Sequence, residues 1–254
     1  MQLSHAQKTH FYEHGFVRIP GCVPRPMVEA ALKAINHSLG EGIPADEVAG
    51  MRVLSFCREL QTAPVILDLL NRTPAWSAAE SLIGEGQIRS VGGAQIALRF
   101  PTLEDPPPPP RPHLDGMHTP TNGVPFGEIR NFTMLVVILL SELTGPYAGN
   151  FTVWPGTHHL YEQYFRDHTP QSLLEGMPPV DLPEPHFVTG QPGDAFLVHY
   201  QLAHSASANA SPHVRYAAIY RLTHVDHDAQ KWEAMTDIWR EYAGMQHIVA
   251  ARRA

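Results

Sequence analysis

The chain has 254 residues, of which 43% are hydrophobic and 17% charged, so it can build a buried core and is not globally disordered. Its length suits a single domain. The net charge of −7, with histidines neutral, argues against a nucleic-acid partner, and the two cysteines, Cys22 and Cys57, form no CxxC motif and are expected to be free thiols.

The first 85 or so residues carry mainly helical signals. Capping residues, prolines and glycines predict helices over 4–15, 24–40 and 73–84, with a short strand over 16–19. The N-terminus lacks the basic start and apolar segment of a signal peptide, and the longest apolar run, 134–140, is too short to cross a bilayer. We therefore expect a cytoplasmic protein without a membrane partner; its oligomeric state is not indicated.

From about residue 86 the pattern changes to short strands separated by glycine and proline turns. In the first of these, Gln95, Ala97 and Arg99 alternate onto one face. A proline-rich loop over 105–112 follows, and 158–166 is predicted to be a short helix. The remaining predicted strands are 132–140, 151–154, 187–188, 195–200 and 214–222.

The last predicted element is a helix over about 228–242, with an aromatic side that includes Trp232, Trp239 and Tyr242. Helices followed by many short strands predict a mainly β protein with peripheral helices around a double-stranded β-helix, a cupin-like jelly roll. We expect one domain over 1–254, with a helical part at about 1–85, the jelly-roll core at about 86–223 and the C-terminal helix.

Two His-x-Asp motifs occur, His113 to Asp115 and His224 to Asp226. Alternate residues of a strand point the same way, so this spacing presents an imidazole and a carboxylate together. Two histidines and one carboxylate on one face of a metal are the signature of non-haem Fe(II) oxygenases. The first motif is favoured because a long β-rich stretch follows it, whereas 224–228 is interpreted as a polar turn and helix cap.

The third ligand is expected in the segment 193–209, where His199 and His204 both compete. Arg215 lies eleven residues after His204 on a predicted apolar strand. A guanidinium pairs well with a carboxylate in two-pronged geometry, so Arg215 is a candidate anchor for a keto acid; a buried structural salt bridge is the equal alternative.

Five segments in this order resemble the phytanoyl-CoA dioxygenase family of Fe(II)/2-oxoglutarate oxygenases. The resemblance covers most of the chain. The first two are an opening helix and strand at 11–21 and a strand at 95–101 that ends in a basic residue and proline. The His-x-Asp motif at 113–115 is the third. A glycine-led strand at 149–158 that ends in Pro-Gly-Thr-His and a distal histidine and arginine within 193–215 complete the set.

This resemblance implies Fe(II) held by His113, Asp115 and His204, with 2-oxoglutarate anchored by Arg215 and contacted by Gln95. Dioxygen is then the second co-substrate, and no catalytic residue is expected beyond the metal ligands. The implied reaction hydroxylates an unactivated C–H bond of a small molecule, with release of succinate and CO₂. Nothing in the sequence names the substrate or its binding residues.

Two details of the resemblance bear on the chemistry. Relatives often have a serine two residues after the distal histidine, where this chain has Ala206; halogenating relatives lack the carboxylate that Asp115 supplies. Arg99 shares a face with Gln95 and is a candidate contact for the substrate or only for a surface carboxylate, and Arg52 loosely matches another co-substrate contact. The alternative function is a non-catalytic or non-oxidative metal-binding jelly-roll (cupin) protein.

Overall fold

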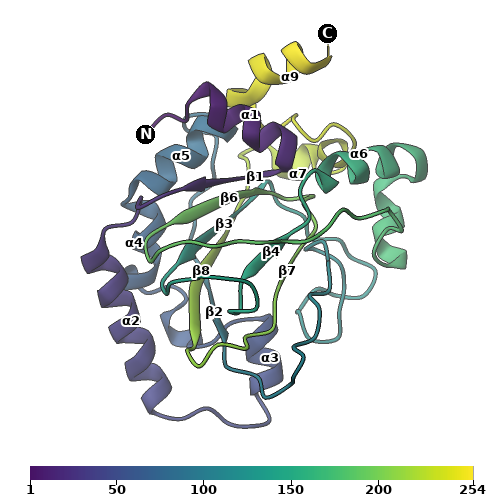
Figure 1. The fold of residues 1–254 in the computed structure, drawn as a ribbon. Coiled ribbons are helices and arrows are strands. Elements are labelled where there is room, and N and C mark those ends of the chain that lie inside the picture. The colour runs from purple at the N-terminus through teal and green to yellow at the C-terminus, as the bar shows by residue number, and fades with distance from the viewer. Residues whose placement is uncertain (254) are drawn as a thin grey trace.

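Two antiparallel sheets form the centre of the computed structural model, which describes residues 1–253 (Figure 1). The larger has the order β1-β6-β3-β8-β2 and the smaller the order β5-β4-β7. The strands are β1 (Phe16–Ile19), β2 (Gln95–Arg99), β3 (Met134–Leu139), β4 (Phe151–Val153), β5 (His186–Phe187), β6 (Ala195–His199), β7 (His204–Ala206) and β8 (Arg215–Leu222).

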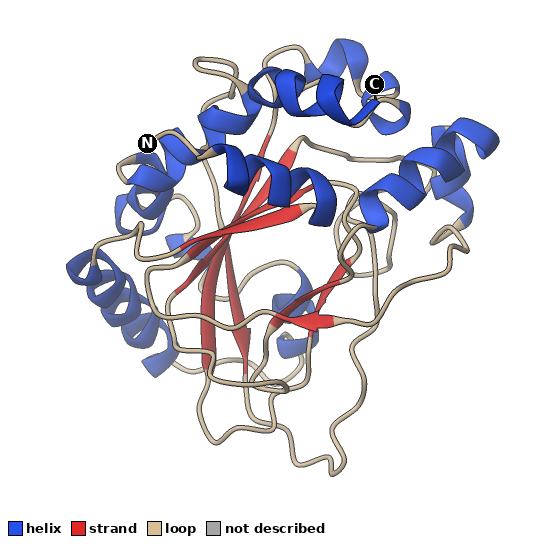
Figure 2. Cartoon of the chain, turned by 45° about the horizontal axis from the view of Figure 1, so that its top comes forward, coloured by secondary structure: helices blue, strands red, loops and turns tan. Residues whose placement is uncertain are grey.

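Most helices lie above and to the left of the red strands in Figure 2, where they are blue, and loops occupy the lower side. More residues lie in helices than in strands, although the sheets occupy the centre. The helices are α1 (His5–His14), α2 (Arg25–Gly40), α3 (Val48–Val53), α4 (Pro64–Asn71), α5 (Pro74–Ile83), α6 (Thr157–His168), α7 (His227–Gln230), α8 (Glu233–Thr236) and α9 (Gln246–Arg253). Within residues 1–253, no helix is long and apolar enough to span a membrane.

The central strand β3 explains how the layers pack. Its six residues are all buried. Met134, Val136 and Ile138 face a core shared with α1, α2, α4 and α5, whereas the alternate residues face a core shared with the small sheet. A strand covered on both faces needs a continuous apolar run rather than alternation. The large sheet is thus the middle layer, between the N-terminal helices and the small sheet.

The local signals at the N-terminus act as predicted. Ser4 caps α1 in a reciprocal capping box with Gln7, and Gly15 ends the helix in the left-handed region. Thr73 caps α5, and both cysteines are free and buried. Sequence analysis did not predict α3, α4, α9 or the short strand β7.

The predicted helix over 228–242 is wrong. The chain forms two single-turn helices, α7 and α8, and Asp237 then leaves helical geometry with φ −134° and ψ 80°. The Ile238 carbonyl accepts a hydrogen bond from His199, and Trp239 and Tyr242 are buried beside Phe11 of α1. Tertiary packing thus spreads these apolar residues over turns instead of a helix face.

Candidate metal centre

Main-chain pairing at the edge of the small sheet brings His113 and His204 together. His204 begins β7, and the backbone N–H of each histidine donates to the carbonyl oxygen of the other, at 3.0 and 3.1 Å. Residues paired in this way project their side chains from the same face. The two imidazole centroids lie 4.6 Å apart.

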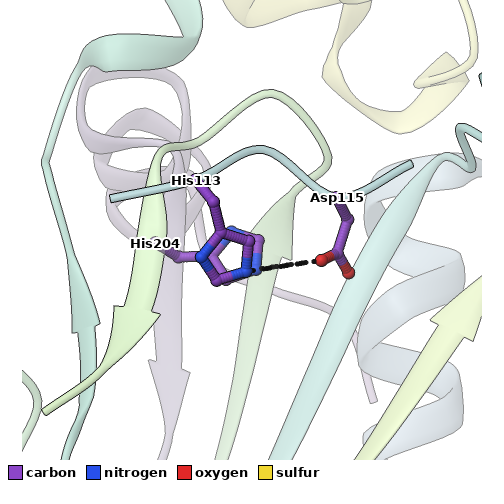
Figure 3. Close-up of side chains that lie close together, drawn as sticks. All are labelled: His113, Asp115 and His204. Carbon is purple, nitrogen blue, oxygen red and sulfur yellow. Dashed lines mark ion pairs between the residues drawn. The ribbon is translucent and has the colours of Figure 1, made fainter. Parts of the chain in front are cut away.

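Asp115, two residues after His113, completes the cluster. Its Oδ1 lies 3.5 Å from Nε2 of His113 and 3.7 Å from Nε2 of His204. One ligand atom from each residue lies within 4.8 Å of the others, and Figure 3 shows both rings and the carboxylate turned toward one another. Neighbouring ligands of a metal bound at about 2.1 Å are roughly 3 Å apart, so a small closure brings these atoms to bonding geometry. In the described chain this is the only such group of His, Cys, Asp or Glu side chains.

An arginine that sequence analysis missed holds the carboxylate. Arg221 of β8 donates from Nε and Nη2 to Oδ2 of Asp115, at 3.0 and 2.7 Å. Burial alone raises the pKa of Asp115, but Arg221 and the two imidazoles outweigh it and hold that pKa well below its usual range. The alternation of β8 places Arg221 on the same face as Arg215, a signal that was available in the sequence.

The two imidazoles are suited to bind a metal in their neutral form. Nδ1 of His204 lies 3.0 Å from the Leu202 carbonyl oxygen, so an Nδ1–H donor leaves the Nε2 lone pair directed at Asp115. Burial within the protein and the neighbouring His204 lower the pKa of His113, whose exposed side lines the cavity described below. Metal ligation requires neutral imidazole and ionised carboxylate, and the lowered pKa values of His113 and Asp115 favour these forms.

A cavity of about 930 Å³ adjoins the three residues. Small-molecule sites usually measure about 300–1,000 Å³, so this one is large. Alternate residues of three strands of the large sheet form one wall: Gln95, Ala97, Arg99, Leu135, Val137, Arg215, Ile219 and Arg221. Phe151, residues 204–206, parts of 111–130 and the end of α3 form the rest.

Arg215 lies in this wall, and its side chain is buried without a carboxylate. Nε donates to the Gly149 carbonyl at 2.6 Å and Nη1 to the Ala97 carbonyl at 3.0 Å. Across residues 1–253, no Asp or Glu forms an ion pair with it. Burial, and then the charge of Arg99 paired opposite on β2, lower its pKa. The salt-bridge alternative for Arg215 is therefore wrong.

Gly149 allows this arrangement. It has φ +70°, and a Cβ there would lie 2.9 Å from the Cβ of Arg99 and 3.0 Å from the Cβ of Arg215. A larger residue would both strain the backbone and push the two arginines away.

Gln95 also lines the cavity, as do Ala97 and Arg99 on the same face of β2. The amide oxygen of Gln95 accepts a hydrogen bond from Arg221 at 3.2 Å, and the amide nitrogen donates to the Val53 carbonyl at 3.0 Å. An amide has two N–H donors and two lone pairs, so these bonds do not exhaust its capacity for a ligand.

His199, which competed with His204 in the sequence, lies outside the cluster. Nε2 hydrogen-bonds to the Ile238 carbonyl, Nδ1 accepts from the Gln201 backbone, and the ring stacks on Tyr242. Burial lowers its pKa to about 4. Both ring nitrogens are thus used within the core.

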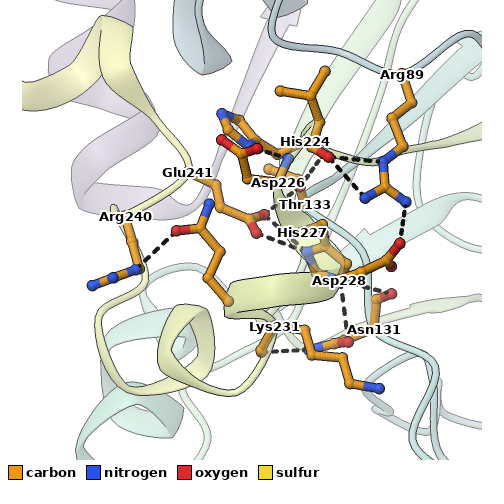
Figure 4. Close-up of polar contacts among 12 residues, drawn as sticks. Arg89, Asn131, Thr133, His224, Asp226, His227, Asp228, Lys231, Arg240 and Glu241 are labelled. Atoms are coloured by element: carbon orange, nitrogen blue, oxygen red, sulfur yellow. Dashed lines mark hydrogen bonds and ion pairs between the residues drawn. The ribbon is translucent and has the colours of Figure 1, made fainter.

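The second His-x-Asp motif forms a structural network instead (Figure 4). His227 pairs with Glu241 at 2.8 Å, and Nδ1 of His224 accepts from the Asp226 backbone at 3.1 Å. Arg89 joins Asp228 to the neighbouring loop. The polar turn was predicted correctly, but the expected cap is incomplete: Asp226 precedes α7 without a capping hydrogen bond from its side chain.

No family model matches the chain, and no curated protein matches it. Solved structures do. HygX from Streptomyces hygroscopicus, with nickel and 2-oxoglutarate bound, is 17% identical with a TM-score of 0.57 and 87% of each chain covered. EctD from S. alaskensis, with 2-oxoglutarate and 5-hydroxyectoine, is 18% identical with a TM-score of 0.59, covering 88% of this chain and 77% of the other. SnoK, a non-haem α-ketoglutarate-dependent carbocyclase from nogalamycin biosynthesis, is 20% identical with a TM-score of 0.54 and 90% of each chain covered. The chain therefore shares the fold of these proteins.

Proposed function

We propose that the protein is an Fe(II)- and 2-oxoglutarate-dependent dioxygenase of the phytanoyl-CoA dioxygenase type, with its two sheets as a jelly-roll core in one domain. One observation carries the proposal. A two-histidine, one-carboxylate cluster and a buried arginine without a carboxylate partner line the same cavity. The metal explains the cluster, and a bound dicarboxylate explains the arginine.

The donor set fits iron(II). His113, Asp115 and His204 offer two nitrogens and one oxygen from one side, which leaves the cavity side for other ligands. Asp115 also distinguishes this site from those of halogenating relatives, so hydroxylation or a related oxidation is the proposed outcome. Arg221 acts on the carboxylate as a positioning residue by fixing Oδ2.

Arg215 is the proposed anchor for the carboxylate of 2-oxoglutarate that is remote from the metal, and Gln95 is a second proposed contact. A carboxylate bound to Arg215 would neutralise its buried positive charge, which the two carbonyl acceptors do not. Ala206 contributes no hydroxyl here, so more of the binding free energy falls on Arg215 than in relatives with serine at this position.

When bound, iron(II), 2-oxoglutarate and dioxygen would together supply the oxidising chemistry, with succinate and CO₂ as the products of 2-oxoglutarate. The protein orients the co-substrate through Arg215, and the apolar side chains of Leu135, Val137 and Phe151 line the cavity beside it. The cavity volume leaves room for a small-molecule substrate beside the co-substrate. SnoN, another structural neighbour, was solved with Fe³⁺, α-ketoglutarate and a nogalamycin compound, which supports a small-molecule substrate.

A non-catalytic or non-oxidative metal-binding cupin is the alternative. It accounts for the metal cluster but gives the buried charge of Arg215 no anion to bind.

Succinate release tests the proposal. Purified protein with Fe(II), 2-oxoglutarate and oxygen should form succinate, slowly without substrate and faster with it. Omission of Fe(II) or oxygen should stop the reaction. Matched variants are His204→Ala and His199→Ala, two buried histidines of which only the first is in the cluster. Succinate formation that survives His204→Ala would reject the proposed site.

A further inference from the structure

The cavity is strongly basic in a chain that is acidic as a whole, with a net charge of −7. Among the described residues that line it, Asp115 is the only carboxylate. The arginines that line it come from two strands, one helix and two loops: Arg52, Arg99, Arg111, Arg130, Arg215 and Arg221. A concave site lined by one sign of charge concentrates ligands of the opposite sign.

Known pairings account for part of this charge. Arg221 is paired with Asp115, and Arg130 with Glu128 at 3.3 Å. Arg215 is assigned to 2-oxoglutarate under the proposed function. Iron(II) and the 2-oxoglutarate dianion cancel in charge, so their binding leaves the positive excess unchanged.

Arg52, Arg99 and Arg111 remain, and in residues 1–253 none of them forms an ion pair. Arg99 donates to the backbone carbonyl of Arg52 at 3.4 Å, and burial together with the charge of Arg52 lowers the pKa of Arg99. The positive charges of Arg52 and Arg99 repel each other, and an anion bound near both would relieve this repulsion. Arg99 lies opposite Arg215 on the paired strand and so belongs to the inner part of the cavity, whereas Arg52 and Arg111 are exposed.

We propose that the substrate carries an oxyanion, either a carboxylate or a phosphate, which Arg52 and Arg111 bind. This assigns Arg52 to the substrate and not to the co-substrate contact that it loosely matches in relatives. The inference rests on the proposed function, since it assigns Arg215 to the co-substrate. Guanidinium groups bind carboxylate and phosphate through paired N–H donors, so both sources share this chemistry. The same cavity contains Leu54, Met117 and Val124, which suit an apolar portion of the substrate.

Three small aromatic probes test this: benzoate, phenyl phosphate and neutral benzamide. The protein is loaded with nickel(II) and saturating 2-oxoglutarate, which fills the Arg215 site, and each probe is titrated by calorimetry at low salt. At least one anion should bind roughly tenfold to a hundredfold more tightly than benzamide. The preferred anion distinguishes a carboxylated from a phosphorylated substrate.

The double variant Arg52→Gln/Arg111→Gln should lose that preference. Arg58→Gln, which removes an exposed arginine outside the cavity, should keep it. Benzamide binding as tightly as both anions, or an anion preference that survives the double variant, would overturn the inference. Calorimetry of 2-oxoglutarate itself, run first, separates the two proposals. Without metal-dependent 2-oxoglutarate binding the proposed function fails, whereas normal binding without an anion preference rejects only the inference.

Discussion

Substitution of Arg215 separates a co-substrate anchor from a structural arginine. In Arg215→Lys the planar fork becomes a single ammonium group, which keeps the charge but cannot make the same paired hydrogen bonds. Loss of one charge-assisted hydrogen bond costs about 1.5–3 kcal/mol, so the dissociation constant for 2-oxoglutarate should rise roughly tenfold to a hundredfold. Arg215→Ala should weaken binding further, because the bound carboxylate is then buried without a partner.

The structure also sets the cost to stability. Arg215 satisfies two carbonyl oxygens, those of Gly149 and Ala97, and each buried acceptor left without a donor costs about 1–3 kcal/mol. Arg215→Ala should therefore unfold more easily than Arg215→Lys. Arg89→Lys is the matched control, because Arg89 also holds a backbone carbonyl, that of Val225, but lies outside the cavity (Figure 4).

The assay is calorimetry of 2-oxoglutarate with nickel(II)-loaded protein, together with urea unfolding of each variant. The co-substrate role predicts weaker binding in folded Arg215→Lys and unchanged binding in Arg89→Lys. A folded Arg215→Ala protein that binds 2-oxoglutarate like the parent would refute the reasoning, since it would make Arg215 purely structural.

Three further predictions concern residues around the site and in the core. Arg221→Leu should lower Fe(II) affinity roughly tenfold to a hundredfold, measured by competition with a chromophoric chelator, because Asp115 loses the group that fixes its second oxygen; unchanged affinity would show that the pair does not position the ligand. Gly149→Ala should lower the free energy of unfolding by about 1–3 kcal/mol and weaken 2-oxoglutarate binding, since it strains a positive φ beside two arginine side chains; Gly145→Ala, where an added Cβ meets nothing within 4 Å, is the control. Burial lowers the pKa of His199 from 6.5 to about 4, so between these pH values the unfolded chain takes up a proton that the folded chain does not, and stability falls by about 3 kcal/mol as the pH drops. The pH dependence of urea unfolding should be flatter by this amount in His199→Gln, and an identical slope would show that folding does not lower the pKa of His199.

Local signals in the sequence predicted most elements, because they act over a few residues. The caps Ser4 and Thr73 and the all-apolar β3 are examples. The helix predicted over 228–242 failed because its residues are bound by partners far away in the chain, such as His199 on Ile238. Helix propensity, which depends on each residue by itself, carries no information about such long-range contacts.

The candidate site was likewise predictable from the sequence only where local spacing identifies its residues. The two-residue spacing of His113 and Asp115 was visible in the sequence, and the alternation of β2 placed Gln95 and Arg99 on the cavity wall. His204 could not be separated from His199 by spacing, since its position depends on a main-chain bridge to His113 at the edge of the small sheet. The absence of a carboxylate near Arg215, within residues 1–253, became apparent only when distant segments were placed around it.

Anaerobic addition of Fe(II) to protein saturated with 2-oxoglutarate tests the central claim most directly, because the iron–keto acid chelate has a weak visible charge-transfer band. We predict this band in the parent and in His199→Ala, and its loss in His113→Ala, Asp115→Ala and His204→Ala. No band in the folded parent protein, or a band that disappears in His199→Ala but persists in His204→Ala, would contradict the account.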